Sequence, residues 1–123
     1  GLDMTLRDVQ SEAKKKGLPW SIAKGFDTSA PISDIISAGK IADPHNLTIT
    51  CKVNGQTRQH SSTGKMIFKI EKLIEFISSI FTLERGDLIY TGTPEGVGKV
   101  INGDIIEAEI DGILKISHKI ISE

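Results

Sequence analysis

The chain has 123 residues, a length that suits one domain with its own hydrophobic core. Its 15 basic and 16 acidic residues give a formal charge of −1 with no long run of either sign, which argues against DNA, RNA or an acidic membrane surface as partner. No segment is apolar for long enough to span a bilayer, and the single Cys51 cannot form an internal disulfide. We therefore expect one domain over residues 1–123 in a reducing intracellular compartment, mitochondrial or cytoplasmic.

The first predicted element is a helix over residues 5–16. Thr5 is a suitable N-cap, Asp8 stands at the capping-box position, and Gly17 is typical of a helix end. Lysines fill the predicted last turn, where positive charge interacts favourably with the helix dipole. The signals at both ends of the segment thus agree on a helix.

Helical spacing places polar side chains on one stripe of this segment: Asp3, Arg7 and Gln10. An Arg fork and an amide beside a helix N-terminus suit a carboxylate ligand, and a hard divalent cation on Asp3 would complete such a site. Taken alone, Asp3 is more simply interpreted as a residue ahead of a capped helix. The stripe as a whole favours a binding pocket.

Residues 17–44 are rich in Gly, Pro, Ser and Asp and predict a long connection. Long connections often carry functional residues. Lys24 lies inside this one. It is either a solvated surface lysine or a cation that faces a reacting carbonyl and stabilises an enolate.

A β-hairpin is predicted next, because apolar and polar residues alternate over residues 47–53 and Asn54-Gly55 is typical of a type I′ turn. Its return strand, residues 56–60, is polar and is expected near a sheet edge. Cys51 falls on the apolar face, which favours a buried, inert thiol. The histidines have no metal-ligand spacing and are interpreted as surface or strand residues: His45, His60 and His118.

The second half of the chain predicts a helix over residues 70–81, which should pack on a sheet, and a short buried strand over residues 88–90. Residues 104–110 and 114–121 form a last hairpin. A two-residue turn between them would mix apolar and charged faces, so a bulge or a longer turn is expected. The order of elements predicts an α+β chain dominated by antiparallel strands.

Residues 91–98, Thr-Gly-Thr-Pro-Glu-Gly-Val-Gly, form a glycine loop. The loop matches neither a Walker motif nor a GxGxxG fingerprint, because Lys99 is followed by Val100 and no helix signal comes after it. One interpretation is a tight turn with glycines at positive φ. The other is a binding loop in which Thr93 donates a hydrogen bond to a carboxylate.

These segments together resemble the C-terminal half of the fumarylacetoacetate hydrolase family, in particular its acylpyruvase and oxaloacetate decarboxylase branch. The similarity extends over nearly the whole chain. Besides the polar stripe and the glycine loop, it is carried by short motifs in the family's order: Gly17-Leu18-Pro19-Trp20, Met66-Ile67-Phe68, Gly86-Asp87 and the stretch 103–110. The resemblance implies a mostly antiparallel mixed β-sandwich or roll with about two helices.

The resemblance also implies a reaction: cleavage of a C–C bond in acylpyruvates, decarboxylation of oxaloacetate, or both, in a homodimer. In the family three carboxylates hold Mg²⁺, with Mn²⁺ or Ca²⁺ as alternatives, and the motif match assigns the last carboxylate to Asp3. Arg7 and Gln10 would contact the 2-oxo-carboxylate of the substrate. Thr93 would bind its carboxylate end, and Lys24, the expected catalytic residue, would contact the carbonyl that becomes an enolate.

The chain departs from the family pattern at its start. The family's other two metal carboxylates, and the His/Glu pair that activates water, belong upstream of Gly1, so the chain resembles a catalytic domain without its N-terminal part. Nothing replaces them, because Glu107 and Glu109 match the family's C-terminal strand. A second hypothesis therefore stays open, a catalytically incompetent fragment or scaffold module of the same fold, since one carboxylate is a poor cage for Mg²⁺.

Overall fold

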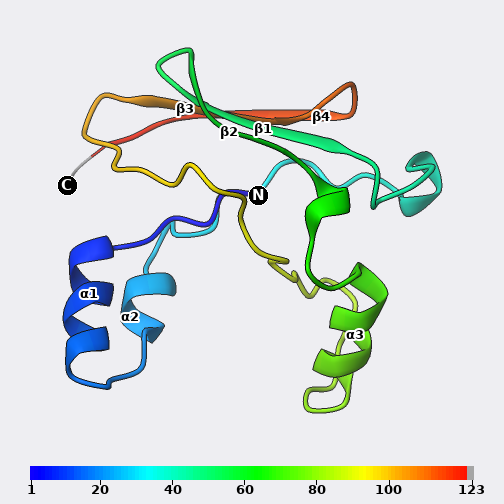
Figure 1. The fold of residues 1–123 in the computed structure, drawn as a ribbon, viewed down its shortest axis with the longest axis horizontal. Helices are drawn as coiled ribbons and strands as arrows, with labels where there is room; N and C mark the ends of the chain where they lie inside the picture. The colour runs from blue at the N-terminus through cyan, green and yellow to red at the C-terminus, as the bar shows by residue number, and fades with distance from the viewer. Residues whose placement is uncertain (122–123) are drawn as a thin grey trace. The chain divides into compact units, whose positions relative to one another are not determined.

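A computed structural model describes residues 1–121 of the chain. The chain divides into two compact units, Gly1–Ser33 and Asp34–Glu123. The first unit is helical, and the second contains the β-sheet (Figure 1). No helix in the part of the chain that the structure describes has the length and apolar character needed to cross a membrane.

The first unit contains α1 (Arg7–Lys15) and α2 (Ser21–Lys24), which pack against each other. The N-cap of α1 is Leu6, with no side-chain cap. Thr5, the predicted N-cap, instead accepts a hydrogen bond of 2.9 Å from Nζ of Lys24. The predicted capping box is therefore wrong, because the hydroxyl is engaged by a side chain that local spacing does not reveal.

The end of α1 is as predicted. Gly17 has a φ of 65°, a conformation that favours glycine. Its N–H donates to the carbonyl of Lys14 at 3.3 Å, and the N–H of Leu18 donates to the carbonyl of Ala13 at 2.9 Å. This pair of bonds is a Schellman motif, which satisfies the last carbonyls of the helix.

Asp3 lies in an extended segment ahead of α1 and not on the helix, so its predicted place on a helical stripe is wrong. The N–H groups of Leu2 and Met4 donate to the carbonyls of Pro31 and Ser29, each at 2.8 Å. Leu2 is buried and anchors the segment. Because neighbouring side chains of an extended chain point to opposite sides, burial of Leu2 directs Asp3 outward.

The second unit is built on a four-stranded antiparallel sheet with the order β2-β1-β3-β4 (Figure 1). The predicted α+β class is confirmed, both predicted hairpins form, and β2 lies at an edge as expected. The strands are β1 (Thr48–Val53), β2 (Gln56–Ser62), β3 (Ile105–Ile110) and β4 (Leu114–Lys119), and two 3₁₀ turns are η1 (Ala38–Lys40) and η2 (Thr63–Lys65).

Both hairpin turns agree with the sequence. Asn54 and Gly55 have φ values of 51° and 77°, as a type I′ turn requires. In the last hairpin Ile110 pairs with Leu114, which leaves a three-residue turn. The longer turn pairs Ile110 with Leu114 and Ala108 with Ile116, so that expectation is also confirmed.

The β1–β2 pairing contains a β-bulge. Cys51 pairs with Gln59, whereas Lys52 pairs with Thr57, so Arg58 is an extra residue on β2. Beyond the bulge, every side chain of β2 lies on the opposite face from the one that a regular hairpin would give it. Gln59 consequently shares the face of Cys51.

The apolar face of the sheet contains its buried apolar residues. Cys51 is among them, as predicted, and burial raises the pKa of its thiol. Val53 of the same strand, and Ile106 of β3, which pairs with Val53, contribute the rest of this small core. The buried apolar residues of the sheet are Cys51, Val53 and Ile106.

Two predictions for the middle of the chain are wrong. The helix α3 (Ile70–Ser78) is shorter than predicted and has no buried residue. Ile74, one of the apolar residues at helical spacing, is 43% exposed, so the expected packing on a sheet is not formed. Residues 88–90 form no strand, and Leu88 is 54% exposed. The apolar spacing exists in both segments, but spacing does not itself supply a partner surface.

The carboxylate of Asp104 links the β1–β2 turn to the start of β3. Nδ2 of Asn54 donates to Oδ1 of Asp104 at 2.8 Å, and the N–H of Ile101 donates to the other oxygen at 2.9 Å. The hydrogen bond from Ile101, followed by that from Asn54, lowers the pKa of Asp104.

This depressed pKa makes part of the stability depend on pH. The contribution is present above the unfolded pKa of about 3.9 and disappears as pH falls through the lower folded value. We expect Asp104→Asn to lower the melting temperature at neutral pH, and the difference from wild type to close as pH falls below the unfolded pKa and through the lower folded one. Thermal unfolding across this range measures the effect, and a difference independent of pH would contradict the assigned role.

Candidate functional site

Lys24, the predicted catalytic residue, is the last residue of α2 and so lies on a short helix within the predicted connection. The helix is fixed by Ala23, which is 1% exposed and whose carbonyl accepts a 3.1 Å bond from the N–H of Leu6. This anchoring brings Lys24 beside the segment ahead of α1. Its ammonium is ion-paired with Oδ1 of Asp3 and donates to Oγ1 of Thr5.

The Lys24–Asp3 pair is partly open to solvent. The two side chains are 36% and 34% exposed, so the attraction is screened and contributes little to stability. An ammonium and a carboxylate held at the surface remain available to a ligand. The structure therefore brings two of the predicted site residues into direct contact and adds Thr5, which the sequence predicts only as a helix cap.

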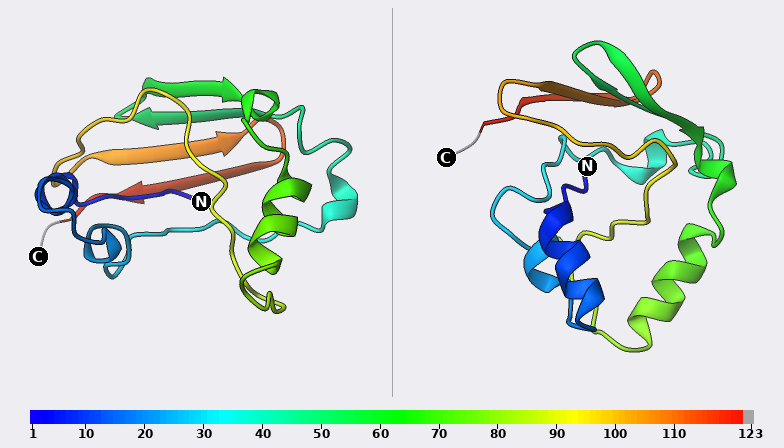
Figure 2. Two further views of the ribbon diagram at one scale, coloured as in Figure 1. Left: turned by 60° about the horizontal axis from the view of Figure 1, so that its bottom comes forward. Right: turned by 60° about the vertical axis from the view of Figure 1, so that its left-hand side comes forward.

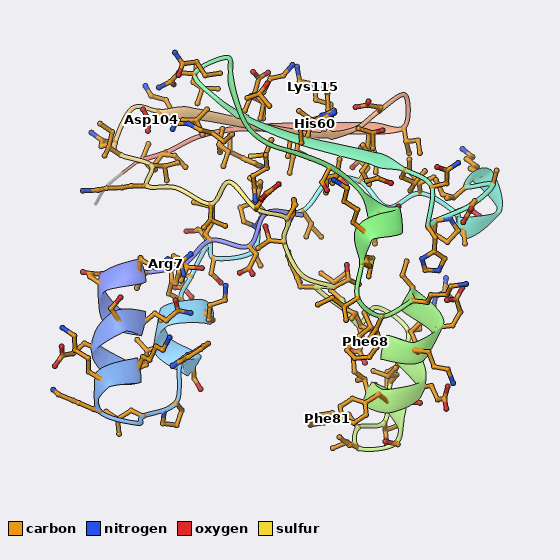
Figure 3. The ribbon with its side chains drawn as sticks, in the orientation of Figure 1. Arg7, His60, Phe68, Phe81, Asp104 and Lys115 are labelled. Carbon is orange, nitrogen blue, oxygen red and sulfur yellow. The ribbon has the colours of Figure 1, made fainter. Side chains whose placement is uncertain are left out.

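Arg7, labelled in Figure 3 at the start of α1, and Gln10 also contact each other. NH1 of Arg7 donates to Oε1 of Gln10 at 2.8 Å, a neighbour contact at the i, i+3 spacing of a helix. Since the amide oxygen of Gln10 is used as acceptor, its NH₂ group and the other Arg7 donors remain to face a ligand. Such a set of donors suits an anion.

Thr93 belongs to the second unit, whereas the other predicted site residues belong to the first. The glycine loop around Thr93 contains no helix or strand. It lies against the edge strand β2, where Nε2 of Gln59 donates to Oγ1 of Thr93 at 2.9 Å and to the carbonyl of Pro94 at 2.8 Å. The convergence of all five side chains on one cavity stays a prediction.

Gly96 shows how closely the glycine loop approaches β2. Its φ is 96°, and a Cβ built there would lie 2.0 Å from the backbone oxygen of Arg58. Only glycine fits this approach. Arg58 is the bulge residue, so the glycine loop contacts β2 at the point where the strand is irregular.

One carboxylate, that of Asp3, is a suitable oxygen ligand for a hard divalent cation. The residues that the structure describes contain no group of three or more His, Cys, Asp or Glu side chains able to hold a metal. Asp3 therefore fits as one ligand of a metal site and does not make a complete site by itself, because Mg²⁺ prefers six oxygen ligands.

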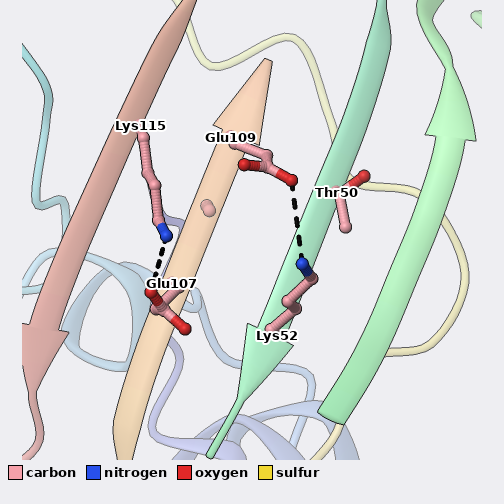
Figure 4. Close-up of a pocket in the computed structure, with 6 residues that line it drawn as sticks. Thr50, Lys52, Glu107, Glu109 and Lys115 are labelled. Atoms are coloured by element: carbon pink, nitrogen blue, oxygen red, sulfur yellow. Dashed lines mark ion pairs between the residues drawn. The ribbon is translucent and has the colours of Figure 1, made fainter. Parts of the chain in front are cut away.

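A shallow hollow on the polar face of the sheet contains none of the predicted site residues (Figure 4). Nζ of Lys115 lies 2.8 Å from Oε1 of Glu107, and Nζ of Lys52 lies 3.9 Å from Oε1 of Glu109. The Lys115 contact lowers the pKa of Glu107. Opposite charges across neighbouring strands support the pairing, so these ion pairs have a structural role.

Two of the histidines have identifiable partners. Nε2 of His45 lies 3.0 Å from Oε2 of Glu71, and Nδ1 of His60 lies 3.0 Å from Oγ1 of Thr50. The pKa of Glu71 is lowered, first by its own backbone N–H and then by His45. These contacts account for both side chains as structural residues.

The chain belongs to the fumarylacetoacetate hydrolase family. The family model described as Fumarylacetoacetate (FAA) hydrolase C-terminal matches residues 1–121. The resemblance stated from the sequence is thereby confirmed, and the match covers both units of the chain.

Named relatives are enzymes. The mitochondrial oxaloacetate tautomerase FAHD1 of Rattus norvegicus is 55% identical over 119 residues, which are 97% of this chain and 54% of the relative. The mitochondrial oxaloacetate decarboxylase of Dictyostelium discoideum is 54% identical, over 91% of this chain and 51% of the relative.

A solved structure agrees with these relatives. Fumarylpyruvate hydrolase from Pseudomonas aeruginosa, in complex with Mn²⁺ and pyruvate, has a TM-score of 0.93 and 39% identity, covering 98% of this chain and 52% of that one. The chain thus spans about half the length of the relatives that it matches.

Proposed function

We propose that this chain forms part of a divalent-metal-dependent enzyme that acts on 2-oxo acids, with oxaloacetate and acylpyruvates as substrates. The names of the relatives support this class, since two act on oxaloacetate and the Pseudomonas hydrolase is in complex with Mn²⁺ and pyruvate. The observation that carries the proposal is the ammonium of Lys24, held at the surface between the carboxylate of Asp3 and the hydroxyl of Thr5.

The candidate reactions share one chemical demand, a negative charge that grows on the oxygen at C2 of the substrate. In decarboxylation the C3–C4 electron pair moves into an enolate, CO₂ leaves, and a proton returns to C3 to give pyruvate. In acylpyruvate cleavage water adds to the acyl carbon, the bond from that carbon to C3 breaks to release a carboxylic acid and the enolate of pyruvate, and a proton returns to C3. Lys24 would stabilise the charge in both, and more in the transition state than in the substrate.

Arg7, Gln10 and Thr93 would bind the carboxylate groups of the substrate. Arg7 supplies a charged fork, and Gln10 and Thr93 supply neutral donors. A bound divalent cation would supply Lewis-acid polarisation of the 2-oxo acid. Asp3 would provide one ligand to this ion, for which Mg²⁺ is proposed and Mn²⁺ or Ca²⁺ are alternatives.

The proposal is tested by adding Mg²⁺ and either oxaloacetate or acetylpyruvate to the full-length protein and following the loss of the enol absorbance. We expect turnover that chelation abolishes and Mg²⁺ restores. Asp3→Asn should weaken metal binding by at least roughly 10-fold, because it replaces a charged ligand by a neutral amide. Asp8→Asn, which removes an acidic residue in the first turn of α1, is the matched control and should leave binding unchanged.

A second candidate is a catalytically incompetent scaffold of the same fold. It is favoured because the described residues contain no group of three or more His, Cys, Asp or Glu side chains that could hold a metal. Calorimetry with Mg²⁺ and oxalate separates the two candidates. Tight, metal-dependent oxalate binding supports the enzyme, and millimolar binding or none supports the scaffold.

Two wider properties belong to the same proposal. We propose a mitochondrial location, which the names of the rat and Dictyostelium relatives support. We also propose a homodimer, with which the exposed apolar side chains of α3 are compatible. Import assays and sedimentation of the full-length protein measure these properties.

A further inference from the structure

We propose that Gln59 is a positioning residue, which fixes the glycine loop on β2 and orients the hydroxyl of Thr93 toward a substrate carboxylate. The inference rests on the proposed function, since Thr93 is assigned there to the substrate. It adds a residue from a different strand, without contact to the substrate, that acts only through the loop.

The first step of the argument is the orientation of the Gln59 amide. Its nitrogen lies 2.8 Å from the carbonyl oxygen of Pro94. A carbonyl oxygen can only accept, so the NH₂ group and not Oε1 must face the loop. The second amide hydrogen then points to Oγ1 of Thr93 at 2.9 Å. Both donors of Gln59 are therefore used on adjacent residues of the loop.

The second step concerns the hydrogen of the Thr93 hydroxyl. A hydroxyl has one hydrogen to donate, and here its oxygen accepts from Gln59. Its own hydrogen must therefore point away from Gln59. Thr93 is exposed, so this hydrogen is open to a ligand. A carboxylate accepts hydrogen bonds and donates none, so it can accept the Thr93 hydroxyl hydrogen, which the contact with Gln59 does not use.

The third step is the way β2 supplies Gln59. A regular hairpin from the Asn54-Gly55 turn would place Arg58 opposite Cys51, but the bulge moves Gln59 to that position. The same residue, Arg58, presents the backbone oxygen that Gly96 approaches. In Figure 2 the yellow segment that follows residue 90 runs to the edge of the sheet formed by β2. The bulge thus serves both contacts of the loop.

Gln59→Glu tests the proposal because it keeps the shape of the side chain and reverses its hydrogen bonding. A carboxylate would accept the Thr93 hydrogen and face the Pro94 carbonyl without a donor. In the full-length protein with Mg²⁺ and oxaloacetate, we expect KM to rise roughly 10- to 100-fold, because one hydrogen bond to a charged group is lost. We expect kcat to change less than about 3-fold. Gln56→Glu, on the exposed start of the same strand, should change neither constant.

A double variant separates positioning from a general effect of the new charge. On a Thr93→Val background, Gln59→Glu should raise KM by less than about 3-fold further, because the hydroxyl through which it acts is gone. Additive effects of the two substitutions would overturn the proposal. So would an unchanged KM in Gln59→Glu while the wild type turns over.

A readout that needs no activity separates failure of the inference from failure of the proposed function. In NMR spectra the side-chain NH₂ of Gln59 should exchange slowly and shift in Thr93→Val, whereas that of Gln56 should do neither. If the wild type has no turnover, the proposed function fails and this measurement alone decides whether Gln59 holds the loop. A fast-exchanging Gln59 amide, unaffected by Thr93→Val, would overturn the inference in either case.

Discussion

Replacing Lys24 by methionine is expected to lower kcat/KM for oxaloacetate by about 10²- to 10³-fold, the usual effect of removing one group that stabilises a growing oxyanion. Methionine keeps the length of the side chain and removes its charge. Because the Lys24–Asp3 pair is partly exposed, the melting temperature should change little. Loss of activity without loss of stability would assign Lys24 to the reaction and not to the fold.

The control for this substitution lies on α1. Lys16 forms an exposed ion pair with Glu12 at 3.0 Å, so Lys16→Met removes a charge and an ion pair of the same kind elsewhere in the first unit. It should leave kcat/KM within about 2-fold of wild type. A Lys24→Met protein with more than a tenth of wild-type activity would contradict the proposed role of the ammonium.

Gly96→Ala is expected to have the largest effect on stability. A Cβ at this position meets the backbone oxygen of Arg58 at 2.0 Å, and φ of 96° is unfavourable for any L side chain. The strained backbone alone costs about 1–3 kcal/mol. The overlap with β2 adds about 1–3 kcal/mol, since a backbone atom cannot rotate out of the way as a side chain does.

The control for Gly96→Ala is Gly86→Ala. Gly86 has a φ of 107°, and nothing lies within 4 Å of a Cβ built there, so the substitution introduces backbone strain without overlap. Urea unfolding of the two variants measures the difference, and hydrogen exchange of residues 91–98 shows whether the loop leaves β2. Equal free energies of unfolding for the two variants would mean that the loop does not press on the bulge.

Local signals in the sequence were sufficient to predict the turns and helix ends whose conformation depends on neighbouring residues. The Asn54-Gly55 turn, the glycine end of α1 and the three-residue turn before β4 depend on φ angles and on alternation, which neighbouring residues determine. The α+β class follows from the same signals. The start of α1 was not predictable in this way, because the hydroxyl of Thr5 is bound by Lys24, which lies nineteen residues further along the chain.

The candidate site was accessible from the sequence in part. Residue types and the family resemblance indicated Lys24 and Asp3, and the structure places them in contact. Gln59 could not be found in this way. Regular pairing from the predicted turn would place Gln59 on the polar face of the sheet. Only the bulge at Arg58 turns Gln59 toward the glycine loop, and no residue type in the sequence predicts that bulge. The prediction of a strand at residues 88–90 was wrong for a related reason, because a strand needs a partner strand that the pattern of apolar residues does not specify.

The single thiol of Cys51 offers a probe of how the apolar face of the sheet becomes uncovered. Cys51 lies on β1, between β2 and β3, and is 8% exposed. Its side chain points out of the face of the sheet, so a reagent such as DTNB reaches the sulfur only when the segments that cover this face move away. The rate of labelling therefore reports how often this face of the sheet is exposed to solvent.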